Sequence, residues 1–536
     1  MQVYDYSTRA SREETVRLLL PYSVSAREAH DADWDRLLDY YSGHHRTQDE
    51  IAESCRQAGI PWISAACPDP YLHVESQIVP DLPAFVFHPR DPADAPKSAQ
   101  REALVRFVLD DQSVPSLTAL HERRCILYGT AVWKVFWDGS AVRVDSVDPR
   151  AVFPDPAASS LEDCEFVNFL YPMQRRMAER MYARELAVRG LDISRMRDTF
   201  GDQDADSDTI TFCEHWYRRR DGRVACSILA GGCELRSIPD YWAKTRYSGF
   251  PFVFQYRVRS GDSIWGSSDV LPALPLVDAV DRELAQAQLS AAFSGSDVIL
   301  AEQDAFASPP ENRPGAVWNL RPGAMEKVRR LGGLEDRADR LAMIDRLREM
   351  IQDTVGNYDI GMGKEPTRTL SATGLAQLIE RSETRRASKK HERMRAYAAL
   401  FRLIDWTVLE FYEDGQVIRL GAAGSGVVYR FSGTDFADAR GYFPGIDCEV
   451  SAVDALQSSR TMLLSMLESL MGHTITRENY PLAAAALSML DSDQGRALRG
   501  HLEKLFGAAA VDASAEAAEE IPHAGENDEV KGEEQA

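Results

Sequence analysis

Apolar residues recur at helical spacing along three stretches in the second half of the chain. The first stretch predicts a helix over 269–295 that begins near Pro272 or Pro275. The second predicts a helix over 334–356. The third pattern continues over 371–412 and predicts a rod of roughly 60 Å, because an α-helix rises about 1.5 Å per residue. A helix of this length is unusual in a globular enzyme.

Each of the first two predicted helices carries one apolar stripe. The stripes consist of Leu276, Val277, Val280 and Leu284 in the first helix, and of Leu341, Ile344, Leu347, Ile351 and Val355 in the second. The acidic residues of the first helix, among them Asp278 and Asp281, lie off its stripe. Between the two helices, 296–333 reads as a small β-rich insert around the proline-rich sequence SPPENRPG.

Alternating apolar positions predict β-hairpins elsewhere. Residues 132–137 and 142–147 have the strand pattern and flank Asp138-Gly139, a strong hairpin turn signal. A second hairpin is predicted from strands at 209–219 and 223–236 joined at Asp221-Gly222. Further strands are predicted at 416–420, 427–431 and 446–450.

The remaining segments read as helices and irregular chain. Ser11 followed by Glu14 fits a capping box at the start of a helical N-terminal region. Residues 71–93 read as extended segments broken by prolines, and 172–198 read as a charged helix. The chain is thus expected to combine helices and strands in an α+β fold.

Composition limits the class of protein. The chain of 536 residues exceeds the size at which a single core keeps growing, so several subdomains are expected. A net charge of -22 argues against a protein that grips nucleic acid, although nucleic acid can still slide past it. No apolar run approaches the roughly 18 residues of a membrane-spanning helix, so a soluble chain without membrane contact is expected. The eight cysteines have no CxxC spacing and are expected to be reduced.

Motifs of enzymes are missing from the sequence. There is no HExxH, GxSxG, Walker or Rossmann signature, so no catalytic residue and no cofactor is expected. The acidic cluster Asp155, Glu162, Asp163 and Glu165 has no spaced ligand set around it. A solvated acidic turn is therefore the favoured interpretation of the cluster, with a metal site as the alternative.

Basic residues gather in the middle of the predicted rod. They are Arg381, Arg385, Arg386, Lys389, Lys390, Arg393 and Arg395. Such a strip can meet DNA or an acidic neighbour, or it can be a solvated face balanced by nearby glutamates. Since the chain as a whole is acidic, contact with a neighbouring subunit is favoured, with Arg385 and Lys389 as interface candidates.

The sequence YGTAVWKVFWDGSAVRVDSVDPRAVFPDPAASSLEDCEFV, which contains the first hairpin, resembles the wing segment of portal proteins of tailed bacteriophages. In that family a hairpin that starts at glycine leads into a corner of the form DP, V.PDP.A and SLED. The order of the predicted elements also resembles that of the family, and the resemblance covers most of the chain.

The resemblance implies a portal-type domain organisation. Its parts are a wing at 1–268, a first stem helix at 269–295, a clip at 296–333, a second stem helix at 334–356, a tunnel loop at 357–370, a long helix at 371–414, wing return strands at 415–452, crown helices at 453–508 and an acidic tail at 509–536. The tail holds nine acidic residues and one Lys, and disorder is expected there.

The resemblance also implies a function. Portal proteins form a ring, usually of twelve copies, at one capsid vertex of the virion, and are assembled in the host cytoplasm. Double-stranded DNA passes through the ring without sequence specificity during packaging and ejection. The partners implied are further copies of the chain, the terminase large subunit, a head-to-tail adaptor, and the major capsid and scaffolding proteins.

Particular residues follow from this resemblance. Lys364 and Arg368 are the tunnel-loop candidates for contact with DNA. The stem candidates for subunit contact are Leu276, Val280 and Leu284, with the acidic side chains of that helix facing the lumen or solvent. The alternatives are a non-channel capsid or tail-connector protein, or a metal-dependent nuclease that uses Asp155 and Asp163.

Overall fold

The structure is a computed structural model. It describes 4–57, 66–201, 208–259, 261, 263–294, 298–309, 318–331, 337–355, 372–413, 415, 417–420, 427–437 and 443–451. The chain divides into two units, which are described separately. The first comprises Met1–Leu82 and Phe87–Cys448, and the second comprises Pro83–Val86 and Glu449–Ala536. The mixture of helices and strands confirms the α+β class.

A five-stranded antiparallel sheet has the order β4-β5-β6-β7-β8. Its strands are β4 (Val152–Pro154), β5 (Phe166–Gln174), β6 (Thr209–Arg218), β7 (Val224–Ala230) and β8 (Cys233–Ile238). The predicted turn at Asp221-Gly222 joins β6 to β7. The single strand predicted over 223–236 is wrong, because Gly231 and Gly232 adopt positive φ values of 54° and 77° and turn the chain between β7 and β8.

A three-stranded antiparallel sheet has the order β3-β2-β9. It contains β2 (Thr130–Trp137), β3 (Val142–Val147) and β9 (Phe252–Tyr256). The predicted hairpin is confirmed, with Trp137 opposite Val142. The Asp138 carboxylate accepts hydrogen bonds from the backbone N–H groups of Ser140 (2.7 Å) and Ala141 (2.9 Å), which fixes the turn.

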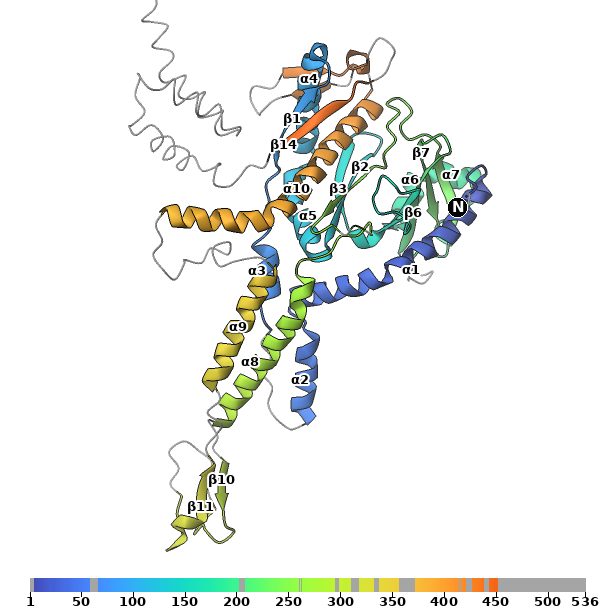
Figure 1. Cartoon of the computed structure of the whole chain (residues 1–536). Helices are drawn as coiled ribbons and strands as arrows, with labels where there is room; N and C mark the ends of the chain where they lie inside the picture. The colour runs from blue at the N-terminus through green and yellow to red at the C-terminus, as the bar shows by residue number, and fades with distance from the viewer. Residues whose placement is uncertain are drawn as a thin grey trace, which may run out of the picture. The chain divides into compact units, whose positions relative to one another are not determined.

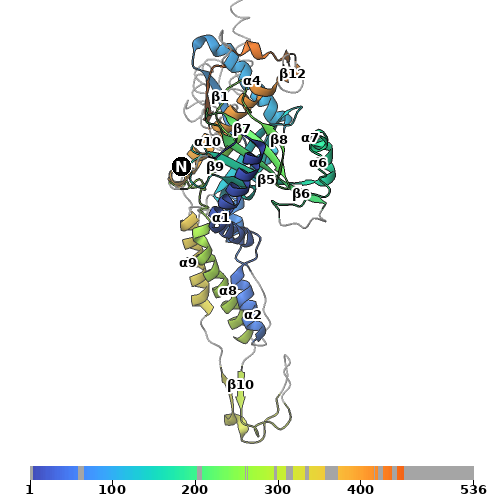
Figure 2. The same ribbon diagram turned by 90° about the vertical axis from the view of Figure 1, so that its right-hand side faces the viewer.

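Helix α1 (Arg9–Tyr41) covers one face of the five-stranded sheet (Figure 2). Val16 packs on Cys213, and Leu19 packs on Tyr217. Alternate residues of a strand point to opposite faces, so Phe212 lies on the other side of β6 and stacks on Tyr182. Tyr182 lies between α6 (Arg175–Met181) and α7 (Ala183–Arg189), which therefore lie on the face opposite α1.

Three local predictions in the N-terminal half are corrected. The cap of α1 is Thr8 and not Ser11, since the Thr8 hydroxyl accepts the Ser11 N–H at 3.1 Å. The proline-rich stretch over 71–93 begins inside the short helix α3 (Asp69–Glu75) and contains β1 (Ala84–Pro89). The charged segment over 172–198 starts as the end of β5, and α6 and α7 follow it.

The predicted helices of the second half are present (Figure 1). They are α8 (Leu274–Ser294), α9 (Arg337–Val355) and α10 (Ala372–Phe411). Between α8 and α9, β10 (Val298–Ala301) pairs antiparallel with β11 (Val328–Leu331). Within the described residues of this predicted β-rich insert, a single further bridge links Leu320 and Phe306.

The other elements are short or lie in the first half of the chain. They are α2 (Arg46–Gln57), α4 (Ala95–Asp111), α5 (Val114–Tyr128), β12 (Val417–Leu420), β13 (Val427–Arg430), β14 (Ile446–Ser451) and the 3-10 turns η1 (Pro92–Asp94), η2 (Pro149–Ala151), η3 (Leu271–Ala273), η4 (Ala324–Lys327) and η5 (Gly433–Asp435). The second unit contributes parts of β1 and β14, which form a two-stranded sheet. The predicted crown helices at 453–508 and the acidic tail lie outside the described residues.

The proline-rich corner that follows the first hairpin is held from inside the protein. The buried Arg27 of α1 donates hydrogen bonds to the carbonyl oxygens of Pro149 (3.1 Å) and Val152 (2.7 Å). Its guanidinium also lies 3.8 Å from the ring centre of Phe153, a cation-π contact. The corner is therefore tied to α1 and continues directly into the edge strand β4.

Gly129, at the start of the first hairpin, packs closely against the backbone at Ser267. Its φ is 73°, and a Cβ atom there would lie 2.4 Å from the Ser267 carbonyl carbon. Gly139 also has a positive φ of 100°, but a Cβ atom would meet nothing within 4 Å. We expect Gly139→Ala to cost about 1–2 kcal/mol of unfolding free energy, from the left-handed backbone alone. We expect Gly129→Ala to cost about 1–3 kcal/mol beyond that, because backbone atoms must move. Urea unfolding of the two variants measures the difference in unfolding free energy. Equal losses of stability would contradict the close packing of Gly129 against Ser267.

Candidate functional site

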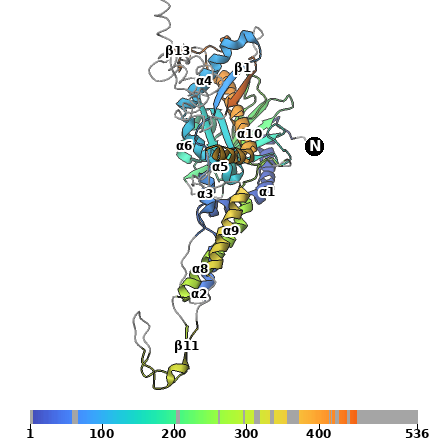
Figure 3. The same cartoon turned by 60° about the vertical axis from the view of Figure 1, so that its left-hand side comes forward.

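Helices α8 and α9 lie side by side (Figures 1 and 3). Val277 and Val280 of α8 and Ile351 of α9 are buried. The predicted stripes are correct in part, since Leu276 and Leu284 are half-buried and Leu341 is exposed. The assignment of Leu341 to the apolar stripe of α9 is therefore wrong, because the helix turns its side chain away from the contact that buries Ile344.

Asp281 of α8 does not face solvent or an open space, contrary to the sequence prediction, and Asp278 is half-buried. Asp281 is buried and accepts a hydrogen bond from the backbone N–H of Cys67 at 2.8 Å. Its second oxygen contacts Nδ1 of His45. Burial alone would lower the pKa of His45, but the hydrogen bond to Asp281 and the negative charge of that carboxylate together raise it.

Asp278 lies one turn before Asp281 and also ties α8 to the N-terminal helices. Its carboxylate accepts hydrogen bonds from the hydroxyl groups of Thr47 (2.6 Å) and Tyr40. The guanidinium of Arg36 lies 3.3 Å away. Thr47 belongs to α2, whereas Tyr40 and Arg36 belong to α1, so the two acids of α8 hold both helices and the connection between them.

Helix α9 is held through a different carboxylate. Arg348 donates two hydrogen bonds of 3.0 Å to the two oxygens of Asp69, the first residue of α3. The Cys67 thiol donates to the same side chain at 3.2 Å. Burial tends to raise the pKa of Asp69, but the hydrogen bond and charge of Arg348 outweigh it, and the pKa is lowered. Both helices of the pair are therefore fixed by ionic contacts to the N-terminal segment.

Helix α10 is tied to the same region by its basic residues. Lys389 pairs with Asp269, which also accepts a hydrogen bond from Arg257 at 2.9 Å. Further along α10, Arg393 donates to Glu122 at 2.8 Å. The Tyr397 hydroxyl donates to the same carboxylate at 3.1 Å. Lys389, a subunit-interface candidate, thus has a partner inside its own chain, close to the start of α8.

The structure describes the remaining sequence candidates only in part. Lys364 and Arg368 lie outside the described residues. Arg385 belongs to α10, but the structure describes only its backbone. Leu284 and Leu276 keep part of their surface open along α8, whereas Val280 is covered by the chain itself.

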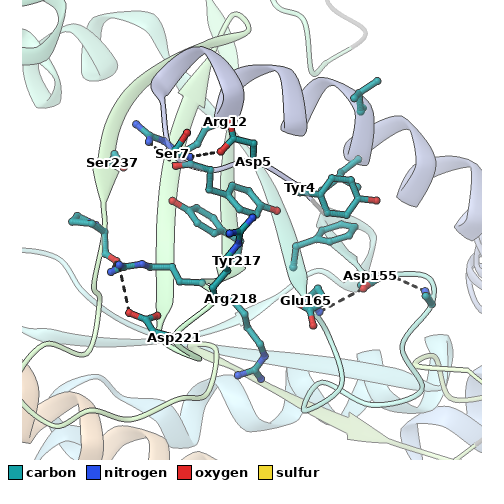
Figure 4. A pocket seen from close by; sticks show the side chains of 18 of the residues that line it. Tyr4, Asp5, Ser7, Arg12, Asp155, Glu165, Tyr217, Arg218, Asp221 and Ser237 are labelled. Atoms are coloured by element: carbon teal, nitrogen blue, oxygen red, sulfur yellow. Dashed lines mark hydrogen bonds and ion pairs between the residues drawn. The ribbon is translucent and has the colours of Figure 1, made fainter. Parts of the chain in front are cut away.

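An open groove of about 1430 Å³ lies beside α1 on the five-stranded sheet (Figure 4). We call it the sheet groove. It is lined by the N-terminal residues Tyr4 and Tyr6, by α1, by the corner after β4 and by the β6–β7 turn. Tyr6 stacks on Tyr217 with ring centres 3.9 Å apart. This groove was not predicted from the sequence, although the tyrosines of MQVYDYS and the basic run YRRRDG were a signal for it.

The acidic cluster of the corner has structural contacts in the groove wall. Asp155 accepts the backbone N–H of Ala157 at 3.0 Å, and Asp163 accepts the Ser160 hydroxyl at 2.7 Å. Among the residues that the structure describes, no group of three or more His, Cys, Asp or Glu side chains is arranged to hold a metal ion. No helix within the described ranges is both long enough and apolar enough to cross a bilayer.

Comparison with known proteins adds no family. No protein-family model matches the chain, and a search of the curated proteins finds no match.

The His45–Asp281 pair predicts a pH-dependent contribution to stability. A raised pKa in the folded state means that the contribution is complete below the ordinary pKa of about 6.5. It is lost as the pH rises through the raised pKa of His45. We expect His45→Gln to cost roughly 3–5 kcal/mol at pH 6, because Asp281 loses its buried partner. The cost should be smaller at pH 9 than at pH 6, because the stabilising charge of the imidazole is lost as the pH rises through this raised pKa.

Urea unfolding at the two pH values measures this difference. His44→Gln is the matched control, since His44 is adjacent and exposed. An equal cost of His45→Gln at pH 6 and pH 9 would show that the pair is not ionic.

Proposed function

We propose that this chain is a portal protein that forms a ring at one capsid vertex and serves as the channel for double-stranded DNA. The observation that carries the proposal is the arrangement of α8, the β10–β11 hairpin and α9. The two helices lie side by side, and the small β insert connects them at one end. Their other ends are tied to an α+β body, and the 40-residue helix α10 follows them. This is the order of stem, clip, stem and long helix in the portal family.

The sequence of the first hairpin supports the proposal independently. The hairpin and the proline corner carry the resemblance to the portal wing, and in the folded chain the buried Arg27 of α1 holds the corner. A corner held by a buried arginine keeps a fixed geometry, which copies that meet at a constant angle require. The ring would contain twelve copies if it follows the family.

The charge of the chain suits a conduit. A net charge of -22 provides few cations for phosphates, and each strong phosphate contact would oppose sliding of the duplex. In this proposal the chain itself performs no catalysis. The terminase large subunit supplies the work of packaging, an adaptor joins the ring to the tail, and the capsid and scaffolding proteins surround it in the virion.

Electron microscopy of the purified full chain tests the proposal. We expect closed rings with a central opening, with a mass in solution equal to a fixed whole number of copies. A chain that remains monomeric across protein concentrations and salt conditions would contradict the proposal. A closed particle without an opening would favour a non-channel capsid or tail-connector protein.

The proposal also predicts that a few positively charged side chains contact the DNA in the channel. In the proposal Lys364 and Arg368 belong to the tunnel loop and touch the moving duplex. We expect the double variant Lys364→Ala with Arg368→Ala to assemble rings normally but to reduce the DNA packaged per particle. The matched control is Lys244→Ala with Arg246→Ala, which removes the same charges from a loop of the body. If the variant packaged as much DNA per particle as the control, Lys364 and Arg368 would not be contacts of the moving DNA.

A further inference from the structure

Two sets of exposed apolar side chains lie on opposite faces of the five-stranded sheet. On one face, α1 exposes Leu18 (57 %) and Tyr22 (52 %), and both line the sheet groove. On the other face, α6 exposes Met177 (46 %) and Met181 (52 %), which are one helical turn apart. Large apolar side chains that gather on a surface mark a site of interaction more often than single ones do.

The two surfaces are complementary in chemistry. The groove is lined by aromatic rings, and methionine side chains adapt to such surfaces and make favourable contacts with ring edges. One side of the groove carries the exposed carboxylates Asp163 and Glu165. On α6, the exposed Arg176 and Arg180 lie next to the two methionines.

The arginines that line the groove have other partners. Arg12 pairs with Glu234, Arg219 pairs with Asp221, and the charge of the exposed Arg220 acts on the carboxylate of Asp5. Arg218 donates to backbone carbonyl oxygens, including that of Cys164 at 2.9 Å. Figure 4 shows Glu165 and Asp155 together, on the side of the pocket away from Arg12. The carboxylate of Glu165 is thus available to a cation from outside.

We propose that the sheet groove of one copy receives helix α6 of a second copy. Met177 and Met181 enter the aromatic groove beside Leu18 and Tyr22, while Arg176 and Arg180 approach Asp163 and Glu165. The inference rests on the proposed ring, to which it assigns the contact between neighbouring bodies.

The placement of the two surfaces determines the kind of assembly. The groove and α6 are different surfaces on opposite sheet faces, so a copy can offer its groove to one neighbour and its α6 to the other. Such a head-to-tail contact repeats around a ring or along an open chain. A groove that paired with another groove would instead close at two copies.

Disulfide trapping in the full chain tests the contact. One preparation carries Tyr22→Cys and another carries Met181→Cys. We expect a disulfide-linked dimer when the two are mixed and oxidised, and none from either variant alone above the level of the unsubstituted chain. A chain that carries both substitutions should give a ladder of linked copies. The matched control replaces Met181→Cys by Leu120→Cys, an exposed apolar position on α5, and should give no dimer.

Reversal of charges at Glu165 and Arg180 tests the ionic part of the same contact. In the trapping mixture, Glu165→Arg on the groove copy should slow dimer formation several-fold. Arg180→Glu on the other copy should restore the rate. The proposed contact would be overturned if the original mixture gave no dimer. It would also be overturned if neither charge change altered the rate of dimer formation.

The outcomes separate this inference from the proposed function. Rings in the microscope without the mixed disulfide dimer would remove the α6 contact and leave the portal proposal standing. A disulfide ladder from copies that form only open chains would support the contact and contradict the portal. Dimers from Tyr22→Cys alone would show a groove-to-groove contact and overturn the inference.

Discussion

Two carboxylates of α8, Asp278 and Asp281, make the contacts on which the arrangement of this chain depends. Asp281 is removed from water and Asp278 is half-buried, and a buried charge is tolerated only when it is paired and hydrogen-bonded. Their partners come from α1, α2 and the segment at Cys67, so α8 leaves the body in the direction that satisfies these bonds. Asp69 does the same for α9 through Arg348, and Asp269 joins α10 to the start of α8. Loss of any of these acids would leave a cation or a donor unpaired at the base of the helix pair.

The sequence predicted the elements whose signals are local. The Asp138-Gly139 hairpin depends on a turn that two adjacent residues and their own backbone determine. The three long helices of the second half follow from apolar spacing over many turns, and their observed limits lie within a few residues of the predicted ones.

The sequence failed where long-range contacts decide the outcome. Asp278 and Asp281 were assigned to solvent because their partners lie more than 200 residues away, and composition favours exposure for any acid on a helix. The contact of Lys389 with Asp269 was not predicted for the same reason, since Asp269 is distant in sequence. The sheet groove was missed because it forms only when Tyr4 and Tyr6 fold back beside β6.

A three-dimensional reconstruction of the assembled full-length chain tests the central claim most directly. The account predicts a closed ring in which every α8–α9 pair surrounds one passage wide enough for a DNA duplex, with α8 held against α1 and α2 as in the single chain. A reconstruction with the α8–α9 pairs far from the symmetry axis, or with no passage between them, would contradict it.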